Sequence, residues 1–450
     1  MSKVLLFLIL SMMCMGMAEH IKAQEASLPI CPPTVVGSGA RALGMGDAFV
    51  AIADDATAAS WNPAGLVQLQ KPEMSLVFSY ERGLLDYKAK ETYYETDGII
   101  VRFKSSHEKV SFEDLNYLSF VYPTSIASRN IVFSFNYQHI YNFSRDFQYE
   151  REVQLVLPGS DPSVRDPDMC FVDTGSYYGE GDLYTVSPAV ALQINPKFAL
   201  GLTTNIWSDT LTNQCNWEHT LKTPDAYPPV ITEKYYDFEA VNVNFGFFWM
   251  INPQLTLAGV YKIPFRARVK REIEATYNDP NYEEPYGDIN KIDFPDVLAL
   301  GVAFRISDAL TISTDITRTD WDRFSLNNRE GEKFGLFTEI DPDTYQAISQ
   351  KVKPTYAVRA GIEYLKILEK TVIPFRAGFF YDPIPSINNP LDSYGMTLGS
   401  GISLGEIIVD IAYQYRFATK IPGKEVGLSG LDQDIEKKSH QIVLSGIYYF

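Results

Sequence analysis

The stretch GSGARALGMGDAFVAIADDATAASWNPAGLVQL, residues Gly37 to Leu69, lies near the start of a chain of 450 residues and differs from nearly everything after it. It is rich in glycine and alanine, contains the turn sequence Asn62-Pro63-Ala64-Gly65, and has no alternation of apolar and polar residues. After Pro72, apolar and polar residues alternate through most of the chain, which is the period of a β-strand. The sequence therefore predicts one small non-strand segment followed by a long series of strands.

Two short helices are the predicted structure of this first segment. Residues 40–53 contain good helix formers and place five apolar side chains on roughly one face, namely Ala42, Met45, Phe49, Ile52 and Ala53. Asp54-Asp55 predicts an N-cap for a second helical turn, and Asn62-Pro63 predicts its end. The glycines would keep the segment slim enough for other backbone to surround it. They do not form G-x-G-x-x-G and follow no predicted strand, which disfavours a phosphate-binding loop.

The residues before this segment predict export from the cytoplasm. Lys3 is followed by an apolar run from Val4 to Met17 and then by small residues suited to cleavage after Ala18 or Ala23. This is the pattern of a secretory signal peptide. We therefore divide the chain into a signal peptide (1–23), an N-terminal segment that contains the helices (24–71) and one strand-rich unit (72–450).

Cysteine content sets a limit on disulfide bonding. Cys31, Cys170 and Cys215 remain after the signal peptide, and this odd number allows at most one internal disulfide. Three cysteines are too few for a disulfide scaffold in a chain of this size. Cys170 and Cys215 fall in two predicted long loops, so a disulfide between them is one expectation to test.

Alternating runs define the strands. Ile131–Tyr137 (IVFSFNY) and Val409–Phe417 (VDIAYQYRF) each place apolar or aromatic residues on one face and mostly small or polar residues on the other. Counting such runs predicts about fourteen strands, and bacterial single-chain barrels have even numbers. The predicted spans are 73–83, 114–124, 130–142, 182–194, 198–208, 233–251, 255–274, 290–306, 310–325, 353–367, 371–383, 393–404, 407–420 and 438–450.

The connections between these strands alternate in length. Tight turns such as Asn195-Pro196-Lys197 and Asn252-Pro253-Gln254 alternate with long loops at 84–113, 143–181, 209–232, 327–351 and 421–437. Outer-membrane barrels sort their connections in this way, with short turns in the periplasm and long loops outside. The mean hydropathy of −0.11 is compatible with a barrel, because only alternate strand residues face lipid. The expected fold is all-β: a fourteen-stranded antiparallel transmembrane β-barrel with an N-terminal helical hatch inside its lumen.

The aromatic content and the terminal Phe450 agree with this fold and suggest which molecules the protein contacts in the cell. Aromatic residues make up 13% of the chain, which suits the two girdles of a membrane barrel. Phe450 closes a final alternating strand, and this ending resembles the signal read by the bacterial barrel-assembly machinery. We expect that machinery, outer-membrane lipid and lipopolysaccharide as partners, and a monomer. The net charge of −17 argues against a nucleic-acid partner.

No motif indicates an enzyme, a cofactor or a metal site. Gly401-Ile402-Ser403-Leu404-Gly405 matches G-x-S-x-G as a string, but another predicted strand follows it where the nucleophile elbow needs a helix. The histidines at 107, 139, 219 and 440 lack ligand spacing, so the sequence predicts no metal.

The predicted lumen contains charged residues. By strand parity the inward-facing residues include Arg305, Asp315, Arg359, Glu363, Asp410, Gln414 and Arg416, with small residues between them. Charges inside a barrel need partners or water. A plug made of the Gly37–Leu69 segment would satisfy some of them, and a purely structural ion-pair network is the alternative.

These features together resemble the outer-membrane long-chain fatty-acid transporter family (the FadL and TodX type, which takes up hydrophobic compounds). The resemblance rests on the order of signal peptide, GARALGMGDAFVAIADDATAASWNPAGL, barrel and terminal Phe, and on Phe294-Pro295-Asp296 and Phe375–Ser386 in later strands. It covers essentially the whole mature chain. The residues that match the family's hatch motif are Gly39, Gly44, Gly46, Asp47, Asn62, Pro63 and Ala64.

The resemblance implies passive uptake of long-chain fatty acids or other hydrophobic small molecules. A ligand would be captured among outer loops, enter a pocket above the hatch, and leave after hatch movement or sideways through a wall defect. Phe334, Leu336 and Phe337 are the proposed hydrophobic capture loop. The sequence assigns no cation for a carboxylate head group, and the strand 130–142 has no Gly or Pro to mark a bulge. A fold-related component of a protein secretion system and a general diffusion porin are the alternatives.

Overall fold

The computed structural model describes residues 37–94, 99–156, 161, 167–212, 215–222, 230–276, 286–328, 331–340, 347–422 and 434–450. The predicted signal peptide, residues 24–36 and Cys31 lie outside the described residues.

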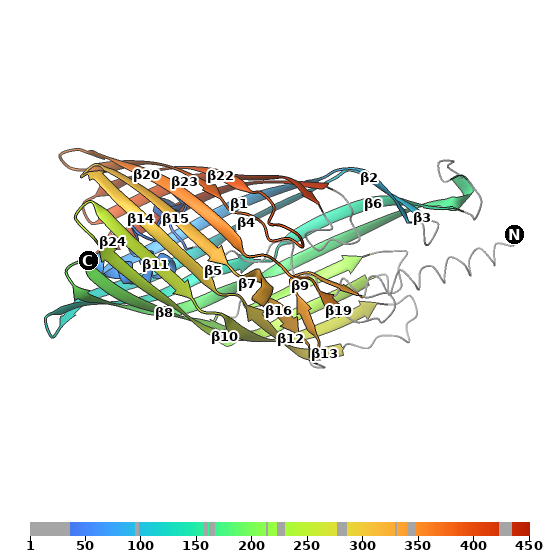
Figure 1. Ribbon diagram of the computed structural model, residues 1–450, viewed down its shortest axis with the longest axis horizontal. Coiled ribbons are helices and arrows are strands. Elements are labelled where there is room, and N and C mark those ends of the chain that lie inside the picture. The colour runs from blue at the N-terminus through green and yellow to red at the C-terminus, as the bar shows by residue number, and fades with distance from the viewer. Residues whose placement is uncertain are drawn as a thin grey trace.

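The described chain closes into one antiparallel barrel that rings through fourteen wall strands (Figure 1). Three wall strands are each built from two consecutive elements, β11 with β12, β13 with β14, and β15 with β16. The barrel closes where β1 pairs with β24, from Glu73↔Tyr449 to Tyr87↔Ile435. In order around the wall, the elements are β1 (Glu73–Tyr87), β4 (Ser106–Ile126), β5 (Arg129–Asn142), β7 (Cys170–Asn195), β8 (Phe198–Ser208), β10 (Val230–Met250), β11 (Leu255–Lys262), β12 (Phe265–Thr276), β13 (Tyr286–Phe294), β14 (Val297–Ser307), β15 (Leu310–Thr319), β16 (Ser325–Asn327), β20 (Thr355–Ile367), β21 (Val372–Tyr381), β22 (Tyr394–Leu404), β23 (Ile407–Pro422) and β24 (Asp434–Tyr449).

The tight turns share one rim, as backbone hydrogen bonds between neighbouring turns demonstrate. The amides of Met250, Arg305, Leu365 and Tyr449 donate to the carbonyls of Lys197, Gln254, Ala309 and Glu406, respectively. The C terminus lies at the same rim, at the left of Figure 1, where the amide of Phe450 donates to the carbonyl of Pro72. We call this the turn rim and the opposite end the mouth.

The strands extend farther toward the mouth than the alternation predicts. Segments expected to be long loops contain further strands, because backbone groups that leave the wall still pair with one another. β3 pairs with both β2 and β6, and β9 fills the space between β7 and β10. The additional elements are β2 (Lys90–Tyr94), β3 (Ile99–Phe103), β6 (Arg145–Leu155), β9 (Asn216–Lys222), β17 (Lys333–Gly335), β18 (Thr338–Ile340), β19 (Ala347–Ser349), η3 (Pro167–Met169), α4 (Asp209–Thr212) and η4 (Trp321–Arg323).

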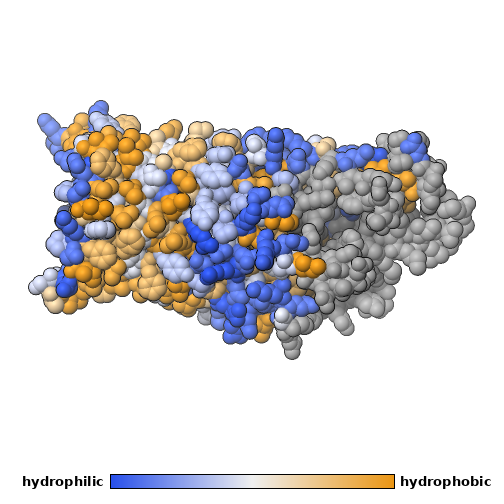
Figure 2. Space-filling model, viewed as in Figure 1, coloured by the Kyte–Doolittle hydropathy of each residue, from blue (hydrophilic) through white to orange (hydrophobic). Residues whose placement is uncertain are grey.

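The outer face of the barrel near the turn rim is apolar. On β14, Val297, Ala299 and Ala303 are buried inside, whereas Leu298, Leu300, Val302 and Phe304 are exposed outside. Figure 2 shows that such residues form an apolar region over the turn-rim half of the barrel, with hydrophilic residues at the rim itself and toward the middle. A surface of this kind is what a barrel presents to lipid.

The hatch is the segment 37–69, and it lies inside the barrel. Its elements are α2 (Ala40–Gly44), α3 (Ala58–Trp61) and η2 (Pro63–Gln68). Most of its apolar side chains, including the fully buried Met45, Phe49 and Leu66, form one core cluster with small residues of the wall, whereas Ala40 and Leu43 belong to a second cluster. Among the described residues, no helix has the length and apolar character needed to cross a membrane.

The helices of the hatch are shorter than the sequence predicts. α2 ends at Gly44 because Gly46 and Asp47 adopt left-handed backbone, with φ of 66° and 61°. Asp55 does not cap α3 in the predicted way. It accepts hydrogen bonds from the amide and hydroxyl of Thr57, and Asp54 binds Arg41 instead.

The expected disulfide between Cys170 and Cys215 is not formed, and both are free thiols. Cys170 begins β7, whereas Cys215 is fully buried. The Cys215 thiol donates a hydrogen bond to the Tyr184 carbonyl at 3.2 Å, so its packing directs it into the protein.

Candidate functional site

Glycines on the inner wall make room for the backbone of the hatch. A Cβ built on Gly361 would lie 2.2 Å from the carbonyl oxygen of Met45, and one on Gly378 would lie 2.1 Å from the nitrogen of Gly46. Real Cβ atoms essentially never approach other atoms this closely, so a side chain at either position would displace the hatch. Three further wall glycines meet the hatch in the same way: Gly201, Gly246 and Gly399.

Asn62 joins the hatch to itself and to the wall. Its side-chain nitrogen donates to the carbonyl of Val50 at 3.1 Å and to the carbonyl of Phe247, on β10, at 3.0 Å. Its side-chain oxygen accepts from the amide of Ala64, and Pro63 begins the 3-10 turn that follows. This one amide therefore satisfies two carbonyls and one N–H in a fully buried place.

The remaining residues of the predicted hatch motif occupy distinct positions. Gly39 has a φ of 115° and packs on Thr57, which explains the need for glycine there. Gly44 and Ala64 oppose the wall glycines 399 and 201, and Asp47 faces the lumen above the hatch.

An ion-pair network holds the turn-rim side of the hatch. The Arg41 guanidinium donates to Asp54 at 2.6 Å and to both oxygens of Glu363, on β20, at 2.9 Å. Arg376 then links Glu363 at 2.7 Å to Asp410 at 2.6 Å. Two of the predicted lumenal charges, Glu363 and Asp410, thus belong to this network, while Arg305 is exposed near the turn rim.

A second charged cluster lies on the mouth side of the hatch. Asp382 Oδ2 forms ion pairs with Arg416, at 3.1 Å, and with Arg359, at 3.5 Å. Asp315 accepts a hydrogen bond from the amide of Val50 at 2.9 Å. Burial raises the pKa of Asp47 to about 6, although Arg359 and Arg416 partly offset this effect.

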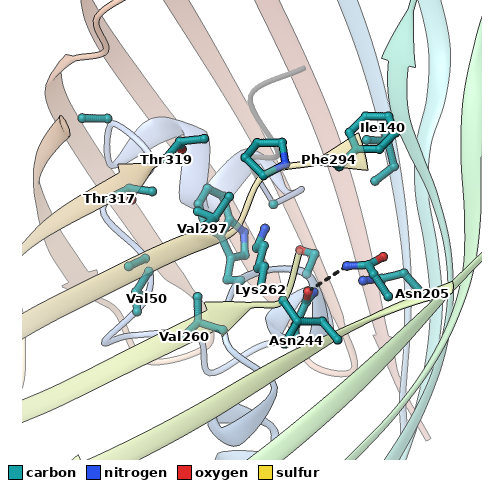
Figure 3. Close-up of a pocket in the computed structure, with 18 of the residues that line it drawn as sticks. Val50, Ile140, Asn205, Asn244, Val260, Lys262, Phe294, Val297, Thr317 and Thr319 are labelled. Carbon is teal, nitrogen blue, oxygen red and sulfur yellow. Dashed lines mark hydrogen bonds between the residues drawn. The ribbon is translucent and has the colours of Figure 1, made fainter. Parts of the chain in front are cut away.

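A cavity of about 90 Å³ lies above this cluster, between the hatch and the mouth (Figure 3). Aromatic side chains form much of its wall, and Lys262 and Arg359, both largely buried, contribute the cations. Amides line another part. The aromatic residues are Trp61, Trp207, Phe265, Phe294 and Trp321, and the amides are Gln138, Asn205, Asn242 and Asn244.

Stacked aromatic rings connect this cavity to the mouth. Phe265 stacks on Phe294 with ring centroids 4.6 Å apart, and both stack on Trp207. Phe238 links Trp207 to Trp217, which stacks on Tyr235 at 4.6 Å. We call this the mouth cluster, namely Phe143, Trp207, Trp217, Tyr235, Phe238, Phe265, Phe294, Trp321 and Phe324.

The predicted capture-loop residues pack against the mouth cluster. Phe337 is buried within it, and Phe334 and Leu336 are half-buried against its edge. They are therefore close to the route into the cavity, but much of their surface is already covered by other apolar groups.

The wall is broken between β4 and β5, which the sequence did not indicate. The ladder between these strands ends at Tyr117↔Gln138, although β4 and β5 both continue toward the mouth. The register shifts between His139 and Tyr141 on β5, and between Val77 and Phe78 where β1 pairs with β4. The bulge on β5 occurs without Gly or Pro in that strand, so no residue type marked its position.

The sequence placed most of the lumenal charges correctly, and the resemblance implied a pocket above the hatch, but neither identified the residues that line the cavity. Lys262 lies on β11, Asp382 follows β21, and the amide residues lie on β5, β8 and β10, and no local motif marks any of them. Only the closure of the barrel brings them together. The pairing of Gly361 with Met45 and of Gly246 with Asn62 is likewise invisible without the fold.

The fold and this site define a class of protein, a β-barrel closed inside by an N-terminal hatch. Neither a protein-family model nor a curated protein sequence matches the chain. Several solved structures, however, are similar to the chain. A FadL homologue of Pseudomonas aeruginosa is similar with a TM-score of 0.62 and 16% identity, covering 93% of this chain and 99% of that one. The toluene transporter TbuX of Ralstonia pickettii matches with a TM-score of 0.53 and 13% identity, covering 93% and 99%.

A third solved structure, the toluene transporter TodX of Pseudomonas putida, matches with a TM-score of 0.52 and 13% identity, covering 92% of this chain and 98% of that one. At these identities the likeness establishes a common fold. The chain thus has the fold of the FadL homologue and of these toluene transporters.

Proposed function

We propose that this protein is an outer-membrane channel for passive uptake of hydrophobic small molecules that carry an anionic or polar head, long-chain fatty acids being the model ligand. The observation that carries this proposal is the cavity above the hatch, which combines aromatic walls with Lys262 and Arg359. An apolar pocket with a few convergent polar groups is the usual form of a ligand site.

The polar lining favours an amphiphile over a plain hydrocarbon. Asn242 already accepts from Trp207 Nε1 at 2.8 Å, and Asn205 accepts from Ser187 at 2.9 Å. A hydrocarbon would remove water from the other polar atoms of this lining and from the nearby cations without replacing the hydrogen bonds of that water, which costs free energy. A carboxylate head would instead accept hydrogen bonds from Lys262 or Arg359.

The route begins at the mouth and ends at the hatch. The mouth cluster offers apolar surface for capture, with Phe334, Leu336 and Phe337 at its edge. The cavity is smaller than the ~150 Å³ site that holds benzene in an engineered protein, so a long chain needs hatch or side-chain movement to pass. The break between β4 and β5 supports a sideways exit as the second option. The hatch fills the lumen, which disfavours a general diffusion porin.

The apolar surface and the tight turns support one orientation in the membrane. We place the apolar region in the outer membrane, the turn rim with Phe450 in the periplasm, and the mouth outside. Residues 24–71 act as the hatch unit and 72–450 as the barrel, after removal of the signal peptide 1–23.

Palmitate binding to the purified, detergent-solubilised barrel tests the function. The wild type should bind it, and Lys262→Gln should weaken binding by about 10-fold, the usual effect of losing one charged hydrogen bond. Binding of methyl palmitate should change little in Lys262→Gln, because the ester has no charge. Lys366→Gln, at an exposed position on β20, is the matched control.

Two results would contradict the proposal. Absence of palmitate binding to a correctly folded wild type would favour the secretion-component alternative. Equal weakening of acid and ester binding by Lys262→Gln would mean that Lys262 acts only on the shape of the cavity.

A further inference from the structure

Three metal-ligating side chains from different strands meet at the break in the wall. Asp114 lies on β4, His139 on β5 and Asp182 on β7, and we call them the Asp-His-Asp cluster. One imidazole nitrogen and one oxygen of each carboxylate lie within 4.8 Å of one another. The cluster lies just beyond Tyr117↔Gln138, where the β4–β5 hydrogen bonds stop.

The histidine contacts a carboxylate through each of its nitrogens. His139 Nε2 is 2.9 Å from Asp182 Oδ1 and also 2.9 Å from the carbonyl oxygen of Tyr141. His139 Nδ1 is 3.3 Å from Asp114 Oδ2. The bulge between His139 and Tyr141 turns that carbonyl toward the ring, which adds a fourth oxygen or nitrogen to the group.

A neutral imidazole cannot satisfy these contacts. It carries one N–H, so one of its nitrogens would present a lone pair to a carboxylate oxygen. Asp114 Oδ2 is buried and, within the described part of the chain, receives no hydrogen bond. Two carboxylates beside a neutral ring carry two negative charges in a partly buried place, and such charges favour a cation.

We propose that the Asp-His-Asp cluster binds one divalent transition-metal ion, with Zn²⁺ as the reference ion, and that this ion ties β4 to β5 and β7 across the break in the wall. Asp114 faces Nδ1 and Asp182 faces Nε2 in the structure, so the imidazole ring turns when one of its nitrogens binds the ion together with both carboxylates. One imidazole nitrogen and two carboxylates form a mixed nitrogen and oxygen set, which suits Zn²⁺ or Mn²⁺ better than Ca²⁺ or Mg²⁺. The ion neutralises the two carboxylates while the ring stays a neutral imidazole, with its one N–H on the nitrogen that does not bind the ion.

Neighbouring groups orient these ligands. Asn142 donates to Asp182 Oδ1 at 2.7 Å, Tyr184 donates to Asp114 Oδ1 at 3.3 Å, and the Tyr184 ring stacks on His139 at 4.6 Å. Partners of this kind fix the rotamers of metal ligands. The ligands are separated by 25 and 43 positions along the chain and lie on three strands, which is why no spacing motif indicates them.

Calorimetry on the full barrel, prepared without a histidine tag, tests the site. We expect Zn²⁺ to bind with one-to-one stoichiometry and to raise the unfolding temperature. His139→Gln and Asp182→Asn should each weaken binding by at least about 10-fold. His219→Gln is the matched control, because His219 is also paired with a carboxylate, Glu233, at 3.3 Å, and it should bind Zn²⁺ like the wild type.

A second measurement separates the metal from a simple proton. If the metal replaces a ring proton, titrations in two buffers of different ionisation enthalpy will report up to one proton released per Zn²⁺ bound. Absence of saturable Zn²⁺ binding to folded wild type would overturn the proposal and leave His139 as an imidazolium between two carboxylates. The proposal would also be overturned if His139→Gln and Asp182→Asn, each shown by heat modification to be folded, bound Zn²⁺ as tightly as the wild type.

Discussion

At the scale of single residues, the surroundings inside the lumen set the pKa of Asp47 and require glycine at position 46. Asp47 adopts left-handed backbone, with a φ of 61°, and is 6% exposed. Burial raises its pKa from 3.8 to about 6, because Arg359 and Arg416 offset only part of the desolvation cost. Gly46 beside it cannot carry a side chain, since a Cβ would lie 2.9 Å from the nitrogen of Phe379.

Asp47 should make the barrel less stable as pH rises from about 4 to 6. The folded state holds the proton that the unfolded state releases, so stability falls by up to about 3 kcal/mol over this range and then stays low. Asp47→Asn removes this titration and tolerates positive φ. Urea unfolding at pH 4 and pH 7 should show that the free energy of unfolding of the variant, relative to that of the wild type, is higher at pH 7 than at pH 4. If the stability difference between variant and wild type were the same at both pH values, the raised pKa of Asp47 would be refuted.

At the scale of elements, the hatch is not a self-standing domain. Its helices have 5, 4 and 6 residues, too short to persist alone. The wall supplies the missing interactions through Asn62, Arg41 and the inward glycines. By contrast, β-strands on the mouth side, such as β6 and β9, continue beyond the closed wall and pair with their neighbours. This pairing supports the residues of the mouth cluster.

Deleting residues 40–64 should leave a folded barrel that conducts small ions more freely, because the hatch fills the lumen on the turn-rim side. Single-channel recording in a planar bilayer is the measurement. Gly361→Val, which displaces the hatch by sterics without removing it, should raise conductance to a smaller extent. If the deletion left conductance unchanged, the hatch would not be what blocks the lumen.

At the scale of the whole molecule, the ladder between β1 and β24 closes the described wall into a ring, with the β4–β5 ladder ending at Tyr117↔Gln138 on the mouth side. We therefore expect a heat-modifiable protein that migrates faster in unheated than in heated gel samples. Its circular dichroism in detergent should be dominated by strand. A mainly helical spectrum, or fractionation with the inner membrane, would be incompatible with this architecture.

The sequence by itself determined the order of segments and the sidedness of the strands. Alternation in Val409–Phe417 predicted which residues face outward, and β8 begins and ends at the predicted residues, 198 and 208. These features are local, because each strand must show one face to lipid and one to the lumen. Inward charges such as Asp315 and Glu363 were predicted for the same reason.

Only the tertiary structure decided what those inward residues do. Closure of the ring places Lys262 beside Arg359, Gly246 against Asn62, and Asp114 beside His139, although no spacing along the chain relates them. The bulge after His139 and the end of the β4–β5 ladder depend on how neighbouring strands diverge, which is a property of several strands together. Sequence periodicity reports one strand at a time, so the cavity and the wall break could come only from the folded barrel.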